Sequence, residues 1–128
     1  MPEQKALLIV GIDPVLIDFS SPDFASYNLT ADRVLSALQA DGERLRSLGY
    51  ETDLCLTDFG DTAARVLEDQ LRAKSYDCVL IGAGVRAIPA NLLLFEKLIN
   101  VVHAIAPRAK ICFNTNPSDT AEAVMRWV

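Results

Sequence analysis

The chain has 128 residues, of which 51% are hydrophobic and 23% are charged, values typical of an ordinary globular protein. A net charge of −5 without any Lys or Arg run excludes a nucleic-acid-binding surface, because phosphate groups repel an acidic protein. The N-terminal apolar stretch is too short for a signal peptide or a membrane span, so we expect a cytoplasmic protein that does not enter a membrane. The length fits one domain, residues 1–128, which needs neither disulfides nor metal to fold.

Three cysteines each lie inside an apolar run of the sequence: Cys55, Cys78 and Cys112. Their odd number and their spacing argue against a disulfide framework and against a zinc site, so we predict three buried, reduced thiols. The single histidine, His103, falls on the polar side of a predicted helix. We therefore expect no metal centre and no catalysis by a Ser–His or Cys–His pair.

Four apolar runs alternate with four helical patterns. The first run, residues 6–12, is apolar throughout, which predicts a strand covered on both faces. A long segment rich in Asp, Ser and Pro follows at residues 13–29. Residues 30–48 have apolar residues at helical spacing, with Thr30 as a predicted N-cap and Gly49 as a left-handed C-terminal cap.

The second run, residues 51–57, alternates between polar and apolar residues, which predicts an edge strand. A helix is predicted over residues 61–74, with Asp61 as its cap. The third run, residues 78–82, is again apolar throughout, so we expect a second central strand there.

The last third of the chain repeats the alternation of helix and strand. Its predicted elements are a helix over residues 89–106, a short strand over residues 110–114 and a closing helix over residues 118–127. Pro89 suits the first turn of the first of these helices, and Pro107 ends it.

Strands that alternate with helices are parallel and are joined by right-handed crossovers. The two fully apolar runs, the first and the third, belong in the centre, which selects the strand order 2-1-3-4. The order 3-2-1-4 would bury the polar second run and expose the third. We therefore predict an α/β three-layer sandwich with a four-stranded parallel sheet, flavodoxin-like but without the fifth strand.

The loops distinguish this chain from three families of related topology. Flavodoxins have a Ser/Thr/Gly phosphate loop after the first strand, where this chain has residues 13–16 (Asp-Pro-Val-Leu). Response-regulator receivers end the third strand on a phosphoacceptor Asp, where this chain has Gly82 and Ala83, and cobalamin domains need a His in the first loop. The chain most resembles small bacterial proteins of flavodoxin-like fold that have no known activity, and this resemblance implies the fold alone.

In a doubly wound sheet, ligands bind beyond the carboxyl ends of the strands where the winding reverses, here between the first and third strands. Two glycines, the start of a helix and Arg86 follow the third strand, so we expect a small anionic or phosphate-containing ligand. The residues also allow a tight turn that needs glycine dihedrals, with Arg86 solvated or paired with a loop Asp. The candidate ligand-binding residues are Asp13, Gly82, Gly84, Arg86, Asn91, Asn114 and Asn116.

Residues 82–87 also match the GxGxxA variant of the dinucleotide fingerprint. The match follows the third strand and not the first, Pro89 would interrupt the required helix, and no acidic residue lies about twenty positions further on. We therefore expect no nucleotide cofactor, and no other cofactor is indicated.

Three functions remain open. The first is a non-catalytic small-ligand or regulatory domain, which the pattern favours over an enzyme. The second is an interaction domain without a ligand. The third is a small hydrolase or transferase in which Asp13 acts as a general base or binds Mg²⁺, assisted by Asp18 and Asp23.

Two stripes of apolar residues on the helix at 89–106 and an open strand edge at 110–114 indicate a homodimer through that helix, that strand or the last helix. The alternative is that apolar residues of the last helix, Val124, Met125 and Trp127, fold back and cover the gap within one chain.

Overall fold

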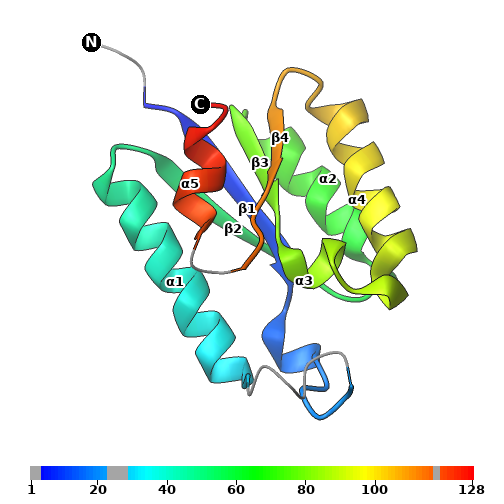
Figure 1. Ribbon diagram of the computed structural model, residues 1–128. Helices are drawn as coiled ribbons and strands as arrows, with labels where there is room; N and C mark the ends of the chain where they lie inside the picture. The colour runs from blue at the N-terminus through cyan, green and yellow to red at the C-terminus, as the bar shows by residue number, and fades with distance from the viewer. Residues whose placement is uncertain (1–3, 23–28, 117–118) are drawn as a thin grey trace.

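A computed structural model of the chain describes residues 4–22, 29–116 and 119–128. Four parallel strands form one sheet in the order β2-β1-β3-β4, which confirms the order predicted from the apolar runs (Figure 1). The strands are β1 (Ala6–Ile12), β2 (Glu51–Thr57), β3 (Cys78–Ile81) and β4 (Lys110–Phe113).

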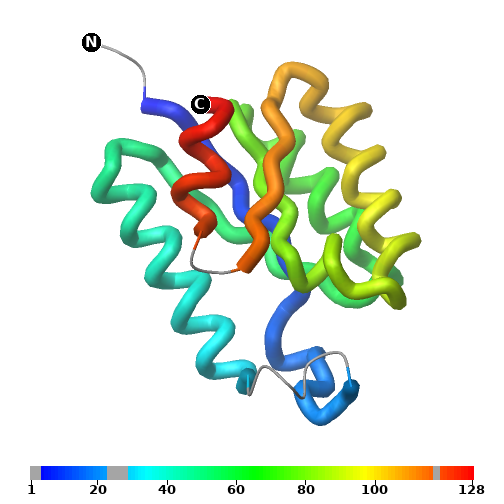
Figure 2. Tube along the Cα trace, viewed as in Figure 1, coloured from blue at the N-terminus to red at the C-terminus, as the bar shows by residue number. Residues whose placement is uncertain are grey.

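Helices cover both faces of the sheet (Figure 1). One face carries α1 (Ala31–Ser47) and α5 (Thr120–Met125), and the other carries α2 (Ala63–Ala73) and α4 (Leu92–Ile105). The Cα trace in Figure 2 follows the chain from α1 on one face to α2 and α4 on the other face, and then back to α5 on the first. The remaining short elements are η1 (Pro14–Leu16), α3 (Ala83–Arg86) and η3 (Pro89–Asn91).

The core consists of two apolar layers that meet at β1 and β3, whose side chains are buried on both sides. Leu8 of β1 packs with Leu98 of α4 in one layer. Ile9 packs with Leu45 of α1 and Val124 of α5 in the other layer. Because a shift of one residue would exchange the two layers, double burial fixes the register of the central strands.

The predicted caps of α1 are both present. The Thr30 hydroxyl accepts a hydrogen bond from the backbone N–H of Arg33 at 3.2 Å. Gly49 follows the helix with a φ of 97°, a conformation that strains any residue with a Cβ.

The predicted cap of α2 is wrong. The N-cap residue is Thr62 and not Asp61. The carboxylate of Asp58 holds this turn instead, because it accepts hydrogen bonds from the backbone N–H groups of Gly60 at 2.9 Å and Thr62. A φ of 138° at Gly60 allows the chain to fold around that carboxylate.

The helix boundaries in the last third of the chain differ from the prediction. The chain forms α3 directly after β3, and Pro89 starts η3, so that α4 begins at Leu92. The last helix, predicted over 118–127, spans Thr120–Met125, and residue 118 lies outside the described residues.

All three cysteines are free and buried, as predicted. Burial raises the pKa of the Cys55 thiol to about 11, so it stays protonated at neutral pH. The sulfurs of Cys78 and Cys112 lie 3.4 Å apart between β3 and β4. Their burial makes these thiols part of the core.

Replacement of Thr52 by Val is expected to stabilise the protein by about 1 kcal/mol. The hydroxyl of Thr52 is buried and has no hydrogen-bond partner in the described part of the chain, whereas valine has a similar shape and suits a strand. Denaturant unfolding measures the change. Thr57→Val is the control, since the Thr57 hydroxyl donates to the Gly11 carbonyl and its loss should destabilise. A Thr52→Val variant that is less stable than the natural chain would show that the buried Thr52 hydroxyl does not destabilise the fold.

Candidate ligand-binding site

The carboxyl ends of β1 and β3 lie side by side, as the predicted site requires. The backbone N–H of Gly82 donates to the Val10 carbonyl at 2.9 Å, which extends the pairing of the two strands by one residue. Here the chain leaves β1 toward α1 on one face and leaves β3 toward α4 on the other (Figure 1). This is the point at which the winding of the sheet reverses.

A cavity of about 90 Å³ opens at this point. We call it the glycine pocket. Its walls are mainly apolar, and they include the backbone at the ends of both strands and side chains from the first half of α1. The residues that define it are Gly11, Val34, Leu38, Gly82, Gly84 and Asn114.

Two of these glycines have no structural reason to be glycine. Neither Gly11 nor Gly84 has a φ in the left-handed region, and a Cβ added to either would meet no atom within 4 Å. By contrast, Gly49 and Gly60 have a positive φ, and a Cβ on Gly42 would approach the Arg46 side chain. Open space therefore lies beside the backbone where the two central strands end.

Among the predicted site residues, Gly82, Gly84 and Asn114 line the glycine pocket. Arg86 does not line the pocket but contacts one lining residue, since its guanidinium donates to the Asn114 carbonyl at 2.8 Å; it also lies 5.9 Å from the centre of the Phe113 ring. One donor of this exposed guanidinium is thus used, and no acidic partner for it occurs within the described ranges.

The other three predicted residues have roles in their own loops. The carboxylate of Asp13 accepts the Val15 N–H at 3.2 Å and caps η1. Asn91 donates from its side chain to the Gly84 carbonyl at 3.0 Å and so braces the backbone of the pocket. Asn116 is exposed, and its N–H donates to Asp119 in the loop after β4.

A chain of hydrogen bonds fixes Asn114. Its side-chain oxygen accepts the Ala83 N–H at 2.8 Å, and its side-chain nitrogen donates to the Thr120 hydroxyl at 3.0 Å. Thr120 in turn donates to the carboxylate of Asp41 at 2.8 Å. This network joins β4, α3, α5 and α1 behind the pocket. Sequence analysis did not find Asp41 or Thr120, because they lie 79 residues apart and neither belongs to a motif.

Three aspartates in the loops that follow the strands, Asp18, Asp58 and Asp119, accept hydrogen bonds from residues of their own loops. Hydrogen bonds from the Ser20 hydroxyl lower the pKa of Asp18, and the Gly60 N–H lowers the pKa of Asp58. The Thr115 hydroxyl similarly lowers the pKa of Asp119. Lowered pKa values make these groups weak bases near neutral pH. Asp23, predicted to assist Asp13, lies outside the described residues.

Across residues 4–22, 29–116 and 119–128, no three His, Cys, Asp or Glu side chains gather in a group suited to a metal ion. His103 is exposed on α4, on the surface where the sequence places it.

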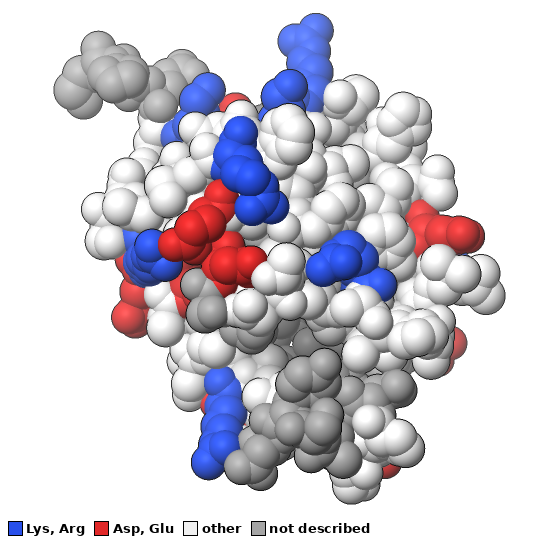
Figure 3. Space-filling view, in the orientation of Figure 1, with Lys and Arg blue, Asp and Glu red and all other residues white. Residues whose placement is uncertain are grey.

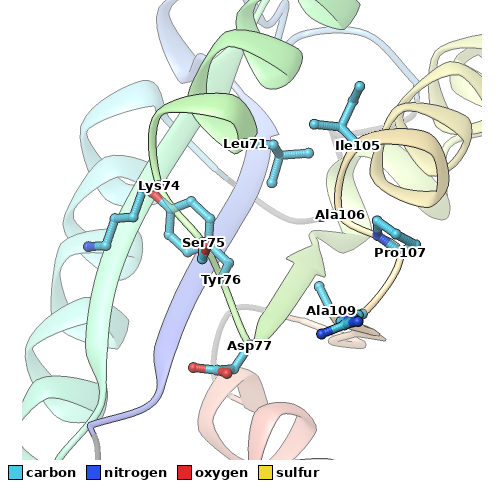
Figure 4. A pocket seen from close by; sticks show the side chains of 10 residues that line it. Leu71, Lys74, Ser75, Tyr76, Asp77, Ile105, Ala106, Pro107 and Ala109 are labelled. Carbon is cyan, nitrogen blue, oxygen red and sulfur yellow. The ribbon is translucent and has the colours of Figure 1, made fainter.

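A larger hollow of about 420 Å³ lies at the opposite end of the sheet, where α2 and α4 end (Figure 4). Leu71 and Ile105 face each other across it, while Lys74 and Asp77 point away. Lys74 donates to Asp53 at 2.9 Å, and Asp77 accepts the Ala6 N–H at 2.8 Å. In a doubly wound sheet, ligands bind at the carboxyl ends of the strands where the winding reverses, so the glycine pocket is the better candidate.

No protein-family model matches the chain, and no relative is found among curated proteins. This agrees with the expectation that the resemblance would lead to no family of known activity. Within the described ranges, every helix is too short or too polar to cross a membrane. The function therefore has to be argued from the pocket and the surface.

Replacement of Asp41 by Asn is expected to raise the melting temperature most at neutral pH. Burial raises the pKa of Asp41 against the opposing effects of the Thr120 hydroxyl and Arg44, and repulsion by Asp119 and Glu122 raises it further. A raised pKa means that the stability from protonated Asp41 is present below the usual carboxyl pKa and is lost as the pH rises.

The advantage of Asp41→Asn should therefore shrink as the pH falls from 7 toward 3.5, about the usual carboxyl pKa, where both side chains are neutral. Asparagine still accepts the Thr120 hydrogen bond, so the network persists. Melting curves of both proteins across this range provide the measurement. An advantage that grows on acidification would show that the pKa of Asp41 is lowered.

Proposed function

We propose that this domain binds a small molecule in the glycine pocket and acts without catalysis, as a ligand-binding or regulatory domain. The observation that carries the proposal is the open space at Gly11 and Gly84, which neither backbone conformation nor packing explains. Glycine at such positions lets a ligand approach the backbone closely. The position at the reversal of the winding, between β1 and β3, supports the same function.

The walls suggest the ligand class. A cavity of about 90 Å³ is well below the usual range for a whole nucleotide or drug-sized molecule, so it suits one compact apolar group. Arg86, which contacts the lining residue Asn114, keeps donors for an anion, and the Asn114 carbonyl and Phe113 ring hold its guanidinium in place. We therefore propose a small anion with a compact apolar body, such as a short or aromatic carboxylate.

An enzyme has less support. Asp13, the proposed base, is engaged by the backbone of η1, and hydrogen bonds from their own loops lower the pKa values of Asp18 and Asp58. A homodimeric interaction domain is the second candidate function. The observation that favours it is the row of half-buried apolar side chains, Phe95 and Ile99, that α4 places beside the outer strand β4.

Replacement of Gly84 by Ala should remove ligand binding and leave the protein as stable or more stable by about 0.5 kcal/mol. Gly84 belongs to α3, where alanine is favoured, and the added methyl group would occupy the space meant for the ligand. Benzoate, isobutyrate and inorganic phosphate are the probes, and the rise in melting temperature on their addition is the measurement.

Gly49→Ala is the matched control. Its φ of 97° makes alanine costly, but it lies at the far end of α1, so the shift caused by a probe should persist. Arg86→Gln should weaken carboxylate binding while the fold remains. The proposal fails if no probe raises the melting temperature, or if Gly84→Ala responds to the probes as the natural chain does.

A further inference from the structure

The two edges of the sheet differ in how far their backbone groups are covered. On β2, the carbonyls of Thr52 and Leu54 face outward and accept hydrogen bonds from Arg46 at 2.8 Å and Gln70 at 3.2 Å. Polar and charged side chains thus cover this edge, a common protection against pairing with another sheet. The outer edge of β4 has less cover.

The register identifies which groups of β4 face outward. The Lys110 N–H donates to the Asp77 carbonyl on the β3 side, so Lys110 and Cys112 face inward and Ile111 and Phe113 face outward. Arg126 donates to the outward carbonyl of Phe113 at 3.1 Å. In the described part of the chain, the outward N–H groups of Ile111 and Phe113 and the Ile111 carbonyl have no hydrogen-bond partner.

Apolar side chains flank this open edge. Phe113 and Ile111 are half-buried, and Phe95 of α4 lies with its ring centre 5.6 Å from that of Phe113. Ile99 continues the row along α4, and Leu92 at its start is 59% exposed. Figure 3 shows few charged side chains on the face over β4 and α4.

We propose that β4 pairs antiparallel with β4 of a second copy of this chain, so that one sheet runs through a homodimer. With Ile111 opposite Phe113 of the partner, each outward N–H meets an outward carbonyl, and both residues exchange their two hydrogen bonds. A carbonyl oxygen accepts two hydrogen bonds, so Arg126 can keep its contact with Phe113. The two-fold axis passes beside Cys112, and the α4 helices of both copies lie on the same face.

Charge complementarity favours a second copy as the partner. Lys110 and Asn114 point to the α5 face, because they alternate with Ile111 and Phe113 along the strand. The two-fold axis places the Lys110 of one copy opposite Asn114 of the other. Beside Asn114, the carboxylate of Asp119 accepts the Thr115 N–H at 2.9 Å.

Asp119 belongs to a group of interacting charged side chains, which we call the acidic cluster. It contains three carboxylates and two guanidinium groups, those of Asp41, Asp119, Glu122, Arg44 and Arg126. The cluster is therefore short of one cation. Lys110 is exposed and has no acidic partner within the described ranges, so its ammonium group in the dimer would supply that cation.

Sedimentation of the natural chain and of two variants tests the interface. Ile111→Pro removes an outward N–H without breaking a bond to β3, as proline does on edge strands. Lys110→Glu places a like charge beside Asp119. Lys97→Glu is the matched control. Lys97 is also an exposed lysine, but it lies on α4 near Gly60, in the turn before α2 and away from the edge of β4.

We expect a dimer of twice 14.0 kDa at about 100 µM for the natural chain and for Lys97→Glu. Ile111→Pro should be monomeric, and Lys110→Glu should raise the dissociation constant by about tenfold. If Ile111→Pro fails to fold, hydrogen exchange of the natural chain decides, since the amides of Ile111 and Phe113 should exchange more slowly as concentration rises.

A natural chain that is monomeric at about 100 µM overturns the proposal. A folded Ile111→Pro variant that stays dimeric, or edge amides whose exchange does not depend on concentration, also overturns it. These outcomes leave the glycine pocket unaffected, because its ligand binding is measured separately.

Discussion

The pairing of β1 with β3 determines the rest of the structure. These strands are not consecutive in the chain, and their parallel register places two strands buried on both faces at the centre of the sheet. β2 and β4 consequently become the edges. The connections leave β1 and β3 on opposite faces, so the space beyond the Val10–Gly82 hydrogen bond is where a pocket forms. The core, the candidate site and the open edge all follow from this pairing.

The strand order could be read from the sequence because it depends on a coarse property, the contrast between fully apolar and alternating runs. Local signals such as Thr30 and Gly49 were equally readable, since a cap depends on residues within one turn. The cap of α2 was missed because Asp58 and Asp61 are chemically alike, and only the path of the loop shows which carboxylate meets the free N–H groups. The short helix α3 left no periodic pattern long enough to detect.

The site was harder to predict because sequence reasoning places residues but does not show how their side chains are used. Asn114 lines the pocket, but both ends of its amide bond to Ala83 and Thr120. The alternative of a glycine turn does not hold for Gly82, whose φ is −69°, or for Gly84, whose φ lies outside the left-handed region. Arg86 bonds to a carbonyl and not to a loop Asp. Such pairings depend on contacts between distant parts of the chain.

Both polar atoms of the Asn114 amide are already hydrogen-bonded to Ala83 and Thr120, which affects how the pocket could distinguish between ligands. A wall whose polar atoms already have partners offers few hydrogen bonds to a ligand, so under the proposed function selectivity would depend on the size of the ligand and on its charge toward Arg86. Apolar cavities reject an oversized molecule by steric clash, yet they separate homologues that differ by one methylene by only about 1–3 kcal/mol. Under the proposed function, such a pocket would bind a group of related small molecules and not one compound, so its occupancy would follow their combined concentration.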